Sequence, residues 1–414
     1  MEQYVQMKDS GVNWILDIPS TWNVRVLFQL ADQVKNKNKD LSEQNLLSLS
    51  YGKIKRKDIN NPEGLLPESF DGYNIIEADD IVLRLTDLQN DHTSLRVGQA
   101  KERGIITSAY TTLRPSVHVN PQYLYYVLHA YDLIKGFYGM GAGVRQGLNF
   151  DEVKTIKVPF PTIEEQRAIV SYLDDQVSQI DFIIEEAQNS IGEYKRWKAS
   201  TIFEAVTKGM NHEAPMKESG VPWIGKIPVH WRMSRIKNEF DNLDYLREPV
   251  SAEKRENKLG LYDYYGASGA IDKIDDYNVD EKVLLIGEDG ANLRMRNLPL
   301  IYRADGKIWV NNHAHILRVK AGNNYSFMAY LLEAGDYNDY ITGAAQPKLS
   351  QANLMRFPIC IPPSEEQYNI GMMLDEKCSM IDEMMQEKTA LIEDTELYKR
   401  SLIYEAVTGK RKVV

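Results

Sequence analysis

The sequence predicts a mixed α/β protein in which two globular α/β domains are separated by two long helices forming an antiparallel coiled coil, with an internal pseudo-two-fold repeat. Three observations predict this architecture: the length of 414 residues, short motifs that occur twice, and two long segments with helical periodicity. We expect a first globular domain over residues 1–161, a helical spacer over 162–210, a second globular domain over 211–362 and a C-terminal helical spacer over 363–414.

Bulk composition favours a soluble, folded, cytoplasmic protein. Hydrophobic residues make up 43% and charged residues 26% of the chain, and no apolar run approaches the ~20 residues that span a membrane. The N-terminus has no basic and apolar stretch typical of a secretory signal. Cys360 and Cys378 stand far apart and the seven histidines are scattered, so we expect reduced cysteines and neither a disulfide framework nor a zinc site.

The net charge of −10 is unevenly distributed. The two predicted globular domains each sum to −1, whereas the two shorter helical segments each sum to −4. Acidic residues repel phosphate only where they lie, so nearly neutral domains remain compatible with nucleic-acid binding if their basic side chains share a face.

The internal repeat consists of three motifs that return in the same order. Residues 7–15 resemble residues 216–224, and each copy is followed by an Ile-Pro pair and a tryptophan. The other two motifs are Pro-x-x-x-Glu-Gln, at 161–166 and 362–367, and Glu-Ala-Val-Thr, at 204–207 and 405–408. The regions between them share little similarity. A duplicated frame with diverged inserts indicates one task performed on two different targets.

The two long segments are predicted to be helices. The first runs from Ile163 to Thr207, begins with a capping-box pattern of Thr162 and Glu165, and carries apolar residues at alternating spacings of three and four. These residues are Val170, Leu173, Val177, Ile180, Ile184, Ala187, Ile191 and Tyr194. The second begins at Ser364 and has a looser pattern, with Lys388 and Thr395 at seam positions. Mutual packing as an antiparallel coiled coil is expected; independent packing on separate domains is the alternative.

Strand and helix patterns occur inside both variable regions. Residues 74–77 and 80–85 are strand-like in the first, and a short helix is predicted from Pro121. Residues 282–287 and 307–310 are strand-like in the second.

Two patterns resemble parts of a methyltransferase. Residues 120–123, Asn-Pro-Gln-Tyr, approximate an adenine methyltransferase motif, and residues 139–143 resemble a cofactor-binding glycine loop. The glycines follow the motif instead of preceding it, and no βαβ unit surrounds them. We therefore expect a helix start at Asn120-Pro121, a turn at the glycines and no cofactor in this chain.

No pattern of catalytic residues is recognisable. His313 and His315 alternate on a predicted strand, where two metal ligands could stand, but without a third ligand nearby hydrogen bonding or stacking is the expected role. Hydrolase and phosphate-loop motifs are not found. We expect a chain that has no catalytic residue and no metal site.

Polar residues in predicted loops suit the reading of DNA. Arginine and lysine can donate to guanine, and asparagine or glutamine can pair with adenine in the major groove. The candidates in the first domain are Lys53, Lys55, Arg56, Lys57, Arg84, Arg96, Arg145 and Gln146. Those in the second are Asn292, Arg294, Arg296, Asn311, Asn312, Gln346 and Lys348. The cluster at 53–57 is expected to hold phosphate, because lysine lacks the fork geometry that specifies a base. Any one of them could instead be a solvated surface residue.

The ordered frame resembles the specificity subunit of type I restriction-modification systems over nearly the whole chain. The residues that carry the resemblance are Ile18-Pro19 with Trp22, Ile227-Pro228 with Trp231, Pro161 with Glu165-Gln166, and Pro362 with Glu366-Gln367. Residues 264–269, 287–292 and 343–350 also resemble loops of that family's target-recognition domains, whereas residues 143–148 match only loosely.

The resemblance implies a non-catalytic subunit that reads a bipartite, asymmetric target in double-stranded DNA, one half with each domain. The helix pair would set the spacing and dock two modification (methyltransferase) subunits. Those partners would carry S-adenosylmethionine, and restriction/translocase subunits would use ATP and Mg. The circular order of motifs also predicts that the segment before Trp22 lies near the C-terminal helix.

Two alternatives stay open at this stage. One is a protein-protein scaffold with a duplicated helical frame that binds no DNA. The other is the recognition part of a restriction enzyme that normally works fused to a nuclease or methyltransferase, although no such domain is recognisable in the sequence.

Overall fold

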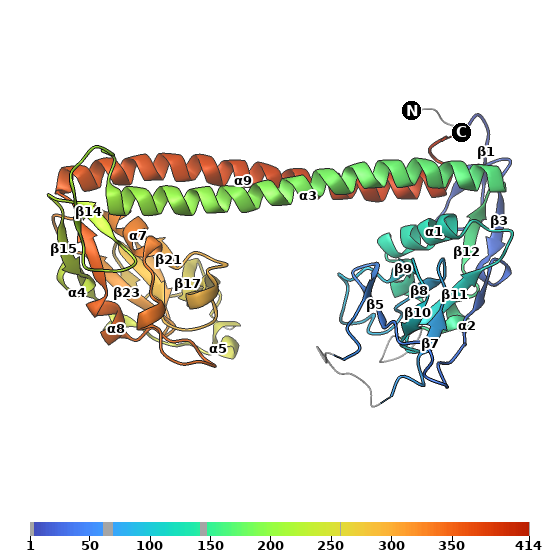
Figure 1. The fold of residues 1–414 in the computed structure, drawn as a ribbon, viewed down its shortest axis with the longest axis horizontal. Coiled ribbons are helices and arrows are strands. Elements are labelled where there is room, and N and C mark those ends of the chain that lie inside the picture. The colour runs from blue at the N-terminus through green and yellow to red at the C-terminus, as the bar shows by residue number, and fades with distance from the viewer. Residues whose placement is uncertain (1–3, 61–68, 141–146, 257, 414) are drawn as a thin grey trace. The chain divides into compact units, whose positions relative to one another are not determined.

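A computed structural model describes residues 4–60, 69–140, 147–256 and 258–413. The chain divides into two compact units, one made of Met1–Ala187 with Ala390–Val414 and the other of Gln188–Thr389. Each unit contains one globular domain and a segment of both long helices (Figure 1). The first unit is therefore assembled from both ends of the chain.

The globular domain of the first unit is mostly antiparallel sheet. Its strands are β1 Met7–Asp9, β2 Asp17–Pro19, β3 Asn23–Val26, β4 Ala31–Gln33, β5 Leu47–Ser50, β6 Lys53–Arg56, β7 Asn74–Ile76, β8 Ile81–Leu83, β9 Val97–Gln99, β10 Gly104–Ile106, β11 Thr111–Pro115 and β12 Lys157–Phe160. Its helices are η1 Leu27–Gln29, α1 Pro121–Leu133, η2 Gly136–Gly139 and α2 Phe150–Val153.

The globular domain of the second unit has the same kinds of element. Its strands are β13 Met216–Glu218, β14 Lys226–Pro228, β15 Arg232–Arg235, β16 Phe240–Asn242, β17 Tyr262–Gly266, β18 Gly269–Ile274, β19 Val279–Asp280, β20 Val283–Gly287, β21 Ile301–Ala304, β22 Lys307–Val310, β23 Ala314–Val319 and β24 Pro358–Ile361. Its helices are α4 Ile236–Glu239, η3 Asp244–Leu246, α5 Ala252–Glu256, α6 Asn292–Met295, α7 Tyr325–Ala334, η4 Asn338–Tyr340 and α8 Gln351–Arg356.

The two domains share one strand topology. A four-stranded sheet of order β4-β11-β8-β9 in the first corresponds to β16-β23-β20-β21 in the second. Both domains also contain a β-hairpin that pairs in parallel with another strand segment. In the second domain it is the sheet β18-β17-β22-β19, and in the first it is reduced to β5-β6 and β10-β7, linked by a single parallel bridge between Leu46 and Ile105. The duplication therefore extends through the variable regions, where the sequence similarity is lost.

Strands and the helix predicted inside these domains are confirmed. β7, β8, β20 and β22 fall within the predicted strand segments, and α1 begins at Pro121. Asn120 caps α1, since its side chain accepts a hydrogen bond from the Tyr123 amide at 3.0 Å. The expected helix start at Asn120-Pro121 is therefore confirmed, whereas residues 141–143 of the glycine run lie outside the described residues.

The two long helices begin at the predicted residues, and the first ends one residue after the predicted Thr207. Helix α3 runs over Ile163–Lys208 and helix α9 over Ser364–Val407. The capping box is present, because Thr162 and Glu165 exchange backbone-to-side-chain hydrogen bonds of 3.1 and 3.3 Å. All eight apolar seam residues predicted in α3 are buried or half-buried.

Helices α3 and α9 run antiparallel within each unit. In the first unit Lys399 pairs with Asp181, and Arg411 donates to the Tyr172 hydroxyl at 3.3 Å. In the second unit Lys198 pairs with Asp382 at 2.6 Å. Buried seam residues join the core of the adjacent domain, Leu173 and Leu402 in the first unit and Ile202 and Leu374 in the second. The predicted mutual packing of the helices is thus confirmed, and independent packing is wrong.

The repeated motifs fasten each domain to the start of one long helix. Trp22 is buried and its indole N–H donates to Glu165 at 3.0 Å, as the indole of Trp231 does to Glu366 at the same distance. A buried glutamine beside each of these glutamates accepts from the backbone amide that precedes α1 or α7. The two bonds, Asn120 to Gln166 and Asn324 to Gln367, both measure 2.9 Å. Hydrogen bonding of buried polar groups explains why these residue types recur together.

The N-terminal motif also holds the end of the opposite helix. The Tyr404 hydroxyl donates to the Trp14 carbonyl at 2.9 Å, and Lys410 donates to the carbonyls of Ile15 and Asp17. The segment before Trp22 therefore lies against the end of α9, which confirms the predicted proximity (Figure 1).

Candidate functional site

Four of the candidate residues of the first domain lie on or next to one exposed hairpin. Lys53, Lys55 and Arg56 belong to β6 and Lys57 follows it, and all four side chains are exposed. Arg56 forms an ion pair with Glu102. The lysines have no ion pair or side-chain hydrogen bond within the described residues. The hairpin therefore presents three uncompensated ammonium groups to solvent.

Arg84 and Arg96 border the connection between β8 and β9, and they differ in exposure. Arg84 is half-buried and lies 3.9 Å from a carboxylate oxygen of Asp91. Arg96 is fully buried, and its guanidinium donates to the carbonyls of Thr86, Asp87 and Asp91 and to the Tyr138 hydroxyl. Arg96 shapes the loop from beneath, so its side chain does not reach the surface on which the sequence placed it.

Beneath this loop, a buried carboxylate accompanies Arg96. The carboxylate of Asp132, on α1, accepts from the Arg96 backbone amide at 2.6 Å, while its other oxygen has no hydrogen-bond partner among the residues that the structure describes. Burial raises the pKa of Asp132 to about 6, against the opposing effect of that hydrogen bond. Arg145 and Gln146 lie outside the described residues.

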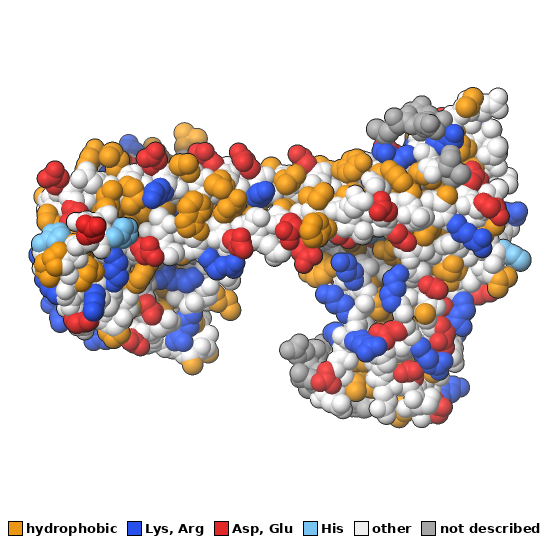
Figure 2. Space-filling model, turned by 45° about the horizontal axis from the view of Figure 1, so that its top comes forward, with side chains coloured by type: hydrophobic (Ala, Val, Ile, Leu, Met, Phe, Trp, Pro, Cys, Tyr) orange, Lys and Arg blue, Asp and Glu red, His pale blue; other side chains and the backbone are white. Residues whose placement is uncertain are grey.

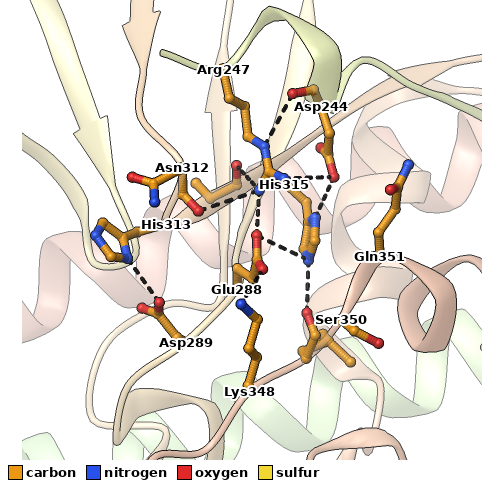
Figure 3. A network of polar contacts seen from close by, with 12 residues as sticks. Asp244, Arg247, Glu288, Asp289, Asn312, His313, His315, Lys348, Ser350 and Gln351 are labelled. Atoms are coloured by element: carbon orange, nitrogen blue, oxygen red, sulfur yellow. Dashed lines mark hydrogen bonds and ion pairs between the residues drawn. The ribbon is translucent and has the colours of Figure 1, made fainter. Parts of the chain in front are cut away.

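Three loops of the second domain converge at one end of its sheet (Figure 3). The Glu288 amide donates to the His313 carbonyl at 2.8 Å, and the Leu349 amide donates to the Glu288 carbonyl at 2.7 Å. The Gly290 amide donates to the Pro347 carbonyl at 3.1 Å. Backbone hydrogen bonds thus join the loops after β20, before β23 and before α8 into one connected surface.

A buried network of charges lies under this surface. The buried imidazole of His315 contacts Asp244 at 2.6 Å and the Leu349 carbonyl at 2.7 Å (Figure 3). Arg247 pairs with Glu288 and lies 3.5 Å from Asp244. Burial by itself raises the pKa of Glu288, but hydrogen bonds from Lys348 and Arg247 outweigh it and lower that pKa below its usual value. The network ties η3 to all three loops.

Exposed polar groups stand over the network. Lys348 pairs with Glu288 at 2.9 Å and keeps half of its side chain exposed, and the pairing raises the pKa of Lys348. His313 contacts Asp289 at 2.8 Å. Asn312 and Gln346 are exposed. These donors and acceptors can hydrogen-bond to base edges or phosphates.

The expected hydrogen-bonding role of the two histidines is confirmed, although His313 precedes β23 and only His315 belongs to it. In the described parts of the chain, no group of three or more His, Cys, Asp or Glu side chains is arranged to hold a metal ion. Both cysteines are free thiols. Within the same residues, no helix is long and apolar enough to cross a membrane.

The remaining candidates of the second domain differ in what their side chains contact. Asn292 holds its own loop through hydrogen bonds with Leu298 and Pro299, and Asn311 is buried and accepts from the His313 amide at 2.7 Å. Arg296 donates to the carbonyls of Glu333 and Gly335. Arg294 is exposed, with no ion pair or side-chain hydrogen bond among the described residues. Arg294 is thus the arginine of this loop that is available to a ligand.

Sequence reasoning missed the charged residues of the buried network. Asp244 and Arg247 lie three residues apart, a spacing that hints at an ion pair, but Glu288 comes from a segment far from both in the sequence. A charged residue directly after a buried strand, such as Glu288 after β20, is a signal that could have been followed.

Comparison with known proteins identifies a family. The family model described as Type I restriction modification DNA specificity domain matches this chain twice, at residues 19–191 and 228–394. A Haemophilus influenzae protein with a name that places it among type I restriction enzyme specificity subunits is 31% identical over 156 residues, which is 37% of this chain and 39% of that protein. The specificity subunit of the Escherichia coli type I restriction enzyme EcoprrI is 27% identical over 123 residues, 30% of this chain and 29% of the relative. Each match spans less than half of the relative's length.

A solved structure shares the fold. A chain from a structure on complex assembly and conformational transition of the type I R-M system matches with a TM-score of 0.67 at 12% identity. The match covers 94% of this chain and 98% of that chain. At this identity the match shows that the two folds are alike.

Proposed function

We propose, from the premise that this chain belongs to the family of type I restriction modification DNA specificity domains, that it reads a bipartite, asymmetric target in duplex DNA. Each globular domain would read one half of the target. The observation that carries the proposal is the double match of the family model, once over each globular domain, together with exposed basic and amide side chains on the loops of both.

The exposed side chains divide into two roles. Lys53, Lys55 and Lys57 suit backbone phosphates, because an ammonium group is a point charge that carries no base preference. In the second domain the exposed side chains of Arg294, Asn312, Gln346 and Lys348 would contact base edges. Arg84, Arg145 and Gln146 remain candidates in the first domain. The structural contacts of Arg96, Asn292, Arg296 and Asn311 assign them to loop support.

The long helices would dock the modification subunits. Large apolar side chains are exposed along them. On the first unit these are Phe182, Ile183, Leu391, Leu397 and Tyr398; on the second they are Trp197, Tyr368, Met372 and Met380. Figure 2 shows hydrophobic side chains between acidic ones along the helices. Exposed apolar surface on a water-facing helix is typical of protein interfaces. Two such surfaces would accept two modification subunits.

Catalysis would reside on the partners. The modification subunits would bind S-adenosylmethionine and methylate adenine, and restriction/translocase subunits would use ATP and Mg to cut unmodified DNA. The length of α3 and α9 would set the number of unread base pairs. Deleting one heptad from each helix is then expected to change the spacer and leave both half-sites intact.

Methylome sequencing tests the proposal. A host that carries this chain with its modification partner is compared with a host that carries the partner alone. We expect a methylated-adenine motif of two short half-sites around a fixed gap, only when this chain is present. An active partner that yields no such motif would contradict the proposal.

A matched pair of variants tests the division of roles. Arg294→Ala is expected to alter one half-site only and to leave stability unchanged, since its side chain has no partner in the described structure. Arg296→Ala removes hydrogen bonds to the Glu333 and Gly335 carbonyls and is expected to lower the thermal midpoint. Equal effects of both variants on stability would count against the proposed role of Arg294.

A further inference from the structure

The turn of the β5–β6 hairpin holds a tyrosine in the left-handed backbone region. Ser50 and Lys53 form the last strand pair, so Tyr51 and Gly52 make a two-residue turn, with φ values of 47° and 75°. Turns of this kind favour Asn-Gly, because a larger side chain in the left-handed region is strained. Local strain at an exposed position points to a role outside folding.

Packing beneath the turn directs the tyrosine outward. A side-chain carbon added to Gly52 would lie 3.0 Å from Cβ of Leu95, so the turn rests closely on the segment that leads into β9. Tyr51 is 76% exposed. Within the described residues its ring stacks on no other ring or cation, and its hydroxyl has no hydrogen-bond partner. The aromatic side chain thus stands unpartnered at the tip of a fixed hairpin.

The two faces of the hairpin differ in chemistry. Leu47 and Leu49 are buried in the domain core, and their cross-strand partners are Arg56 and Ile54. The other face pairs Ser48 with Lys55 and Ser50 with Lys53. Because side chains alternate along a strand, these two serines and two lysines share the outward face.

The outward face is suited to a polyanion. These four side chains supply two hydroxyl donors, two ammonium groups and no carboxylate, while Glu102 pairs with Arg56, whose cross-strand partner Leu47 belongs to the other face. The equivalent turn of the second domain, between β17 and β18, has Ala267 and Ser268 at its tip. The combination of an aromatic tip and a basic face therefore belongs to the first domain.

We propose that Ser48, Ser50, Lys53 and Lys55 bind backbone phosphates of duplex DNA and that Tyr51 places its ring in the adjoining groove. This inference rests on the proposed function. Hydroxyl and ammonium groups are common phosphate ligands, and an aromatic ring contributes contact with sugars and base edges without strict base preference. The hairpin would hold the first domain in register while other loops read bases.

The first test separates folding from binding at Tyr51. Tyr51→Asn creates the preferred Asn-Gly turn, so we expect an unchanged or raised thermal midpoint. Binding of the full chain to a long mixed-sequence duplex, measured by fluorescence anisotropy, is expected to weaken about 5-fold or more. Leu16→Asn is the matched control, because Leu16 has a φ of 60° and is 58% exposed, while glycine stands at the equivalent Gly225. The control is expected to leave duplex binding unchanged.

The second test measures the binding of phosphates by the two lysines. The double variant Lys53→Ala with Lys55→Ala is expected to flatten the dependence of log affinity on log salt by about 2, roughly 0.9 for each phosphate that a lysine no longer neutralises, without changing the methylated motif. Lys154→Ala with Lys157→Ala removes two lysines elsewhere in the same domain and is expected to keep the slope.

The outcomes distinguish the inference from the proposed function. If the parent chain binds duplex and the hairpin variants bind with the same affinity and salt slope, the hairpin inference is wrong and the proposed function stands. If Tyr51→Asn instead impairs association with the modification subunit, the ring serves a protein contact and the inference is also wrong. If the parent chain binds no duplex and directs no methylation, the proposed function itself fails.

Discussion

Leu85 in the first domain and Glu288 in the second occupy equivalent positions. Leu85 lies two residues after β8 and Glu288 directly after the corresponding strand β20, and each carbonyl accepts a hydrogen bond from a leucine amide, Leu148 at 2.8 Å and Leu349 at 2.7 Å. The backbone connection is the same, yet one side chain is apolar and the other anchors a buried ion network. The difference teaches that the two domains have diverged beneath their loops as well as on them.

A second pair of equivalent positions also carries side chains of different chemistry. Counting from the capping residues Asn120 and Asn324, His129 of α1 corresponds to Glu333 of α7. Burial lowers the pKa of His129 to about 4 and raises the pKa of Glu333. Both burials favour the uncharged side chain, which for a base and an acid gives opposite responses to pH.

The largest expected effect comes from the two repeated tryptophans. It tests whether they contribute equally to the free energy of unfolding of the two units. Trp22→Ala and Trp231→Ala each remove a fully buried indole and its hydrogen bond to the long helix, at a cost of about 4 kcal/mol. Denaturant unfolding measures both. Costs that differ by more than about 2 kcal/mol would show that the two copies no longer stabilise their units in the same way.

The next largest effect is expected from placing the leucine of the first domain at the equivalent position of the second. Glu288→Leu leaves Arg247 and Lys348 without their carboxylate, and breaking a buried ion pair is expected to cost about 3 kcal/mol. Adding Arg247→Met should recover part of that loss, because Arg247 would then be a largely buried charge that keeps only Asp244, at 3.5 Å, of its two carboxylates. A loss below about 1 kcal/mol for Glu288→Leu alone would mean that the network contributes to loop position and not to stability.

A smaller effect follows from pH. The pKa of His129 is lowered from 6.5 to about 4 in the folded protein, so between these values the unfolded chain binds the proton more readily. The free energy of unfolding is therefore undiminished above pH 6.5 and decreases as pH falls toward 4. His129→Phe, which keeps a ring beside Tyr125, is therefore expected to be more stable than the parent by about 2 kcal/mol at pH 5, relative to their difference at pH 7. Paired unfolding curves at the two pH values measure this. If the variant and the parent differ in stability by the same amount at both pH values, His129 is not the group responsible for the pH dependence.

The smallest effect concerns the starts of the two long helices. Thr162→Ala removes the capping box of α3 and is expected to cost about 1 kcal/mol. At α9 proline takes the equivalent place at residue 363, and the Ser364 hydroxyl donates to the Gly322 carbonyl at 2.6 Å. Ser364→Ala should therefore loosen a loop contact and cost less. Thermal unfolding of both variants ranks them.

Local patterns predicted most of the fold. The capping box and seam residues of α3, the strand β20 and the cap at Asn120 depend on neighbours in sequence, so periodicity and spacing were sufficient. The sheet topology was not predicted, because pairings such as β17 with β22 join segments far apart in the chain.

The candidate site was predicted by residue type but not by exposure. Sequence alone does not distinguish Arg96, which is buried under a loop, from Lys53, which is exposed on a hairpin. Tyr51 was missed because its significance lies in a backbone angle and in the packing of Gly52. Long-range contacts decide which polar side chains support a loop and which remain available to a ligand.

The packing of the end of α9 against the N-terminal motif determines when each unit can complete its folding during translation. The second unit is one continuous stretch of chain, whereas the core of the first is complete only after residues 390–414 have been translated. Domains generally fold as their full sequence emerges, so the domain translated first is the last to be finished. A premature stop codon near residue 390 would therefore remove Leu402, Ile403, Ala406 and Val407 from the core of the first unit and leave the second unit complete.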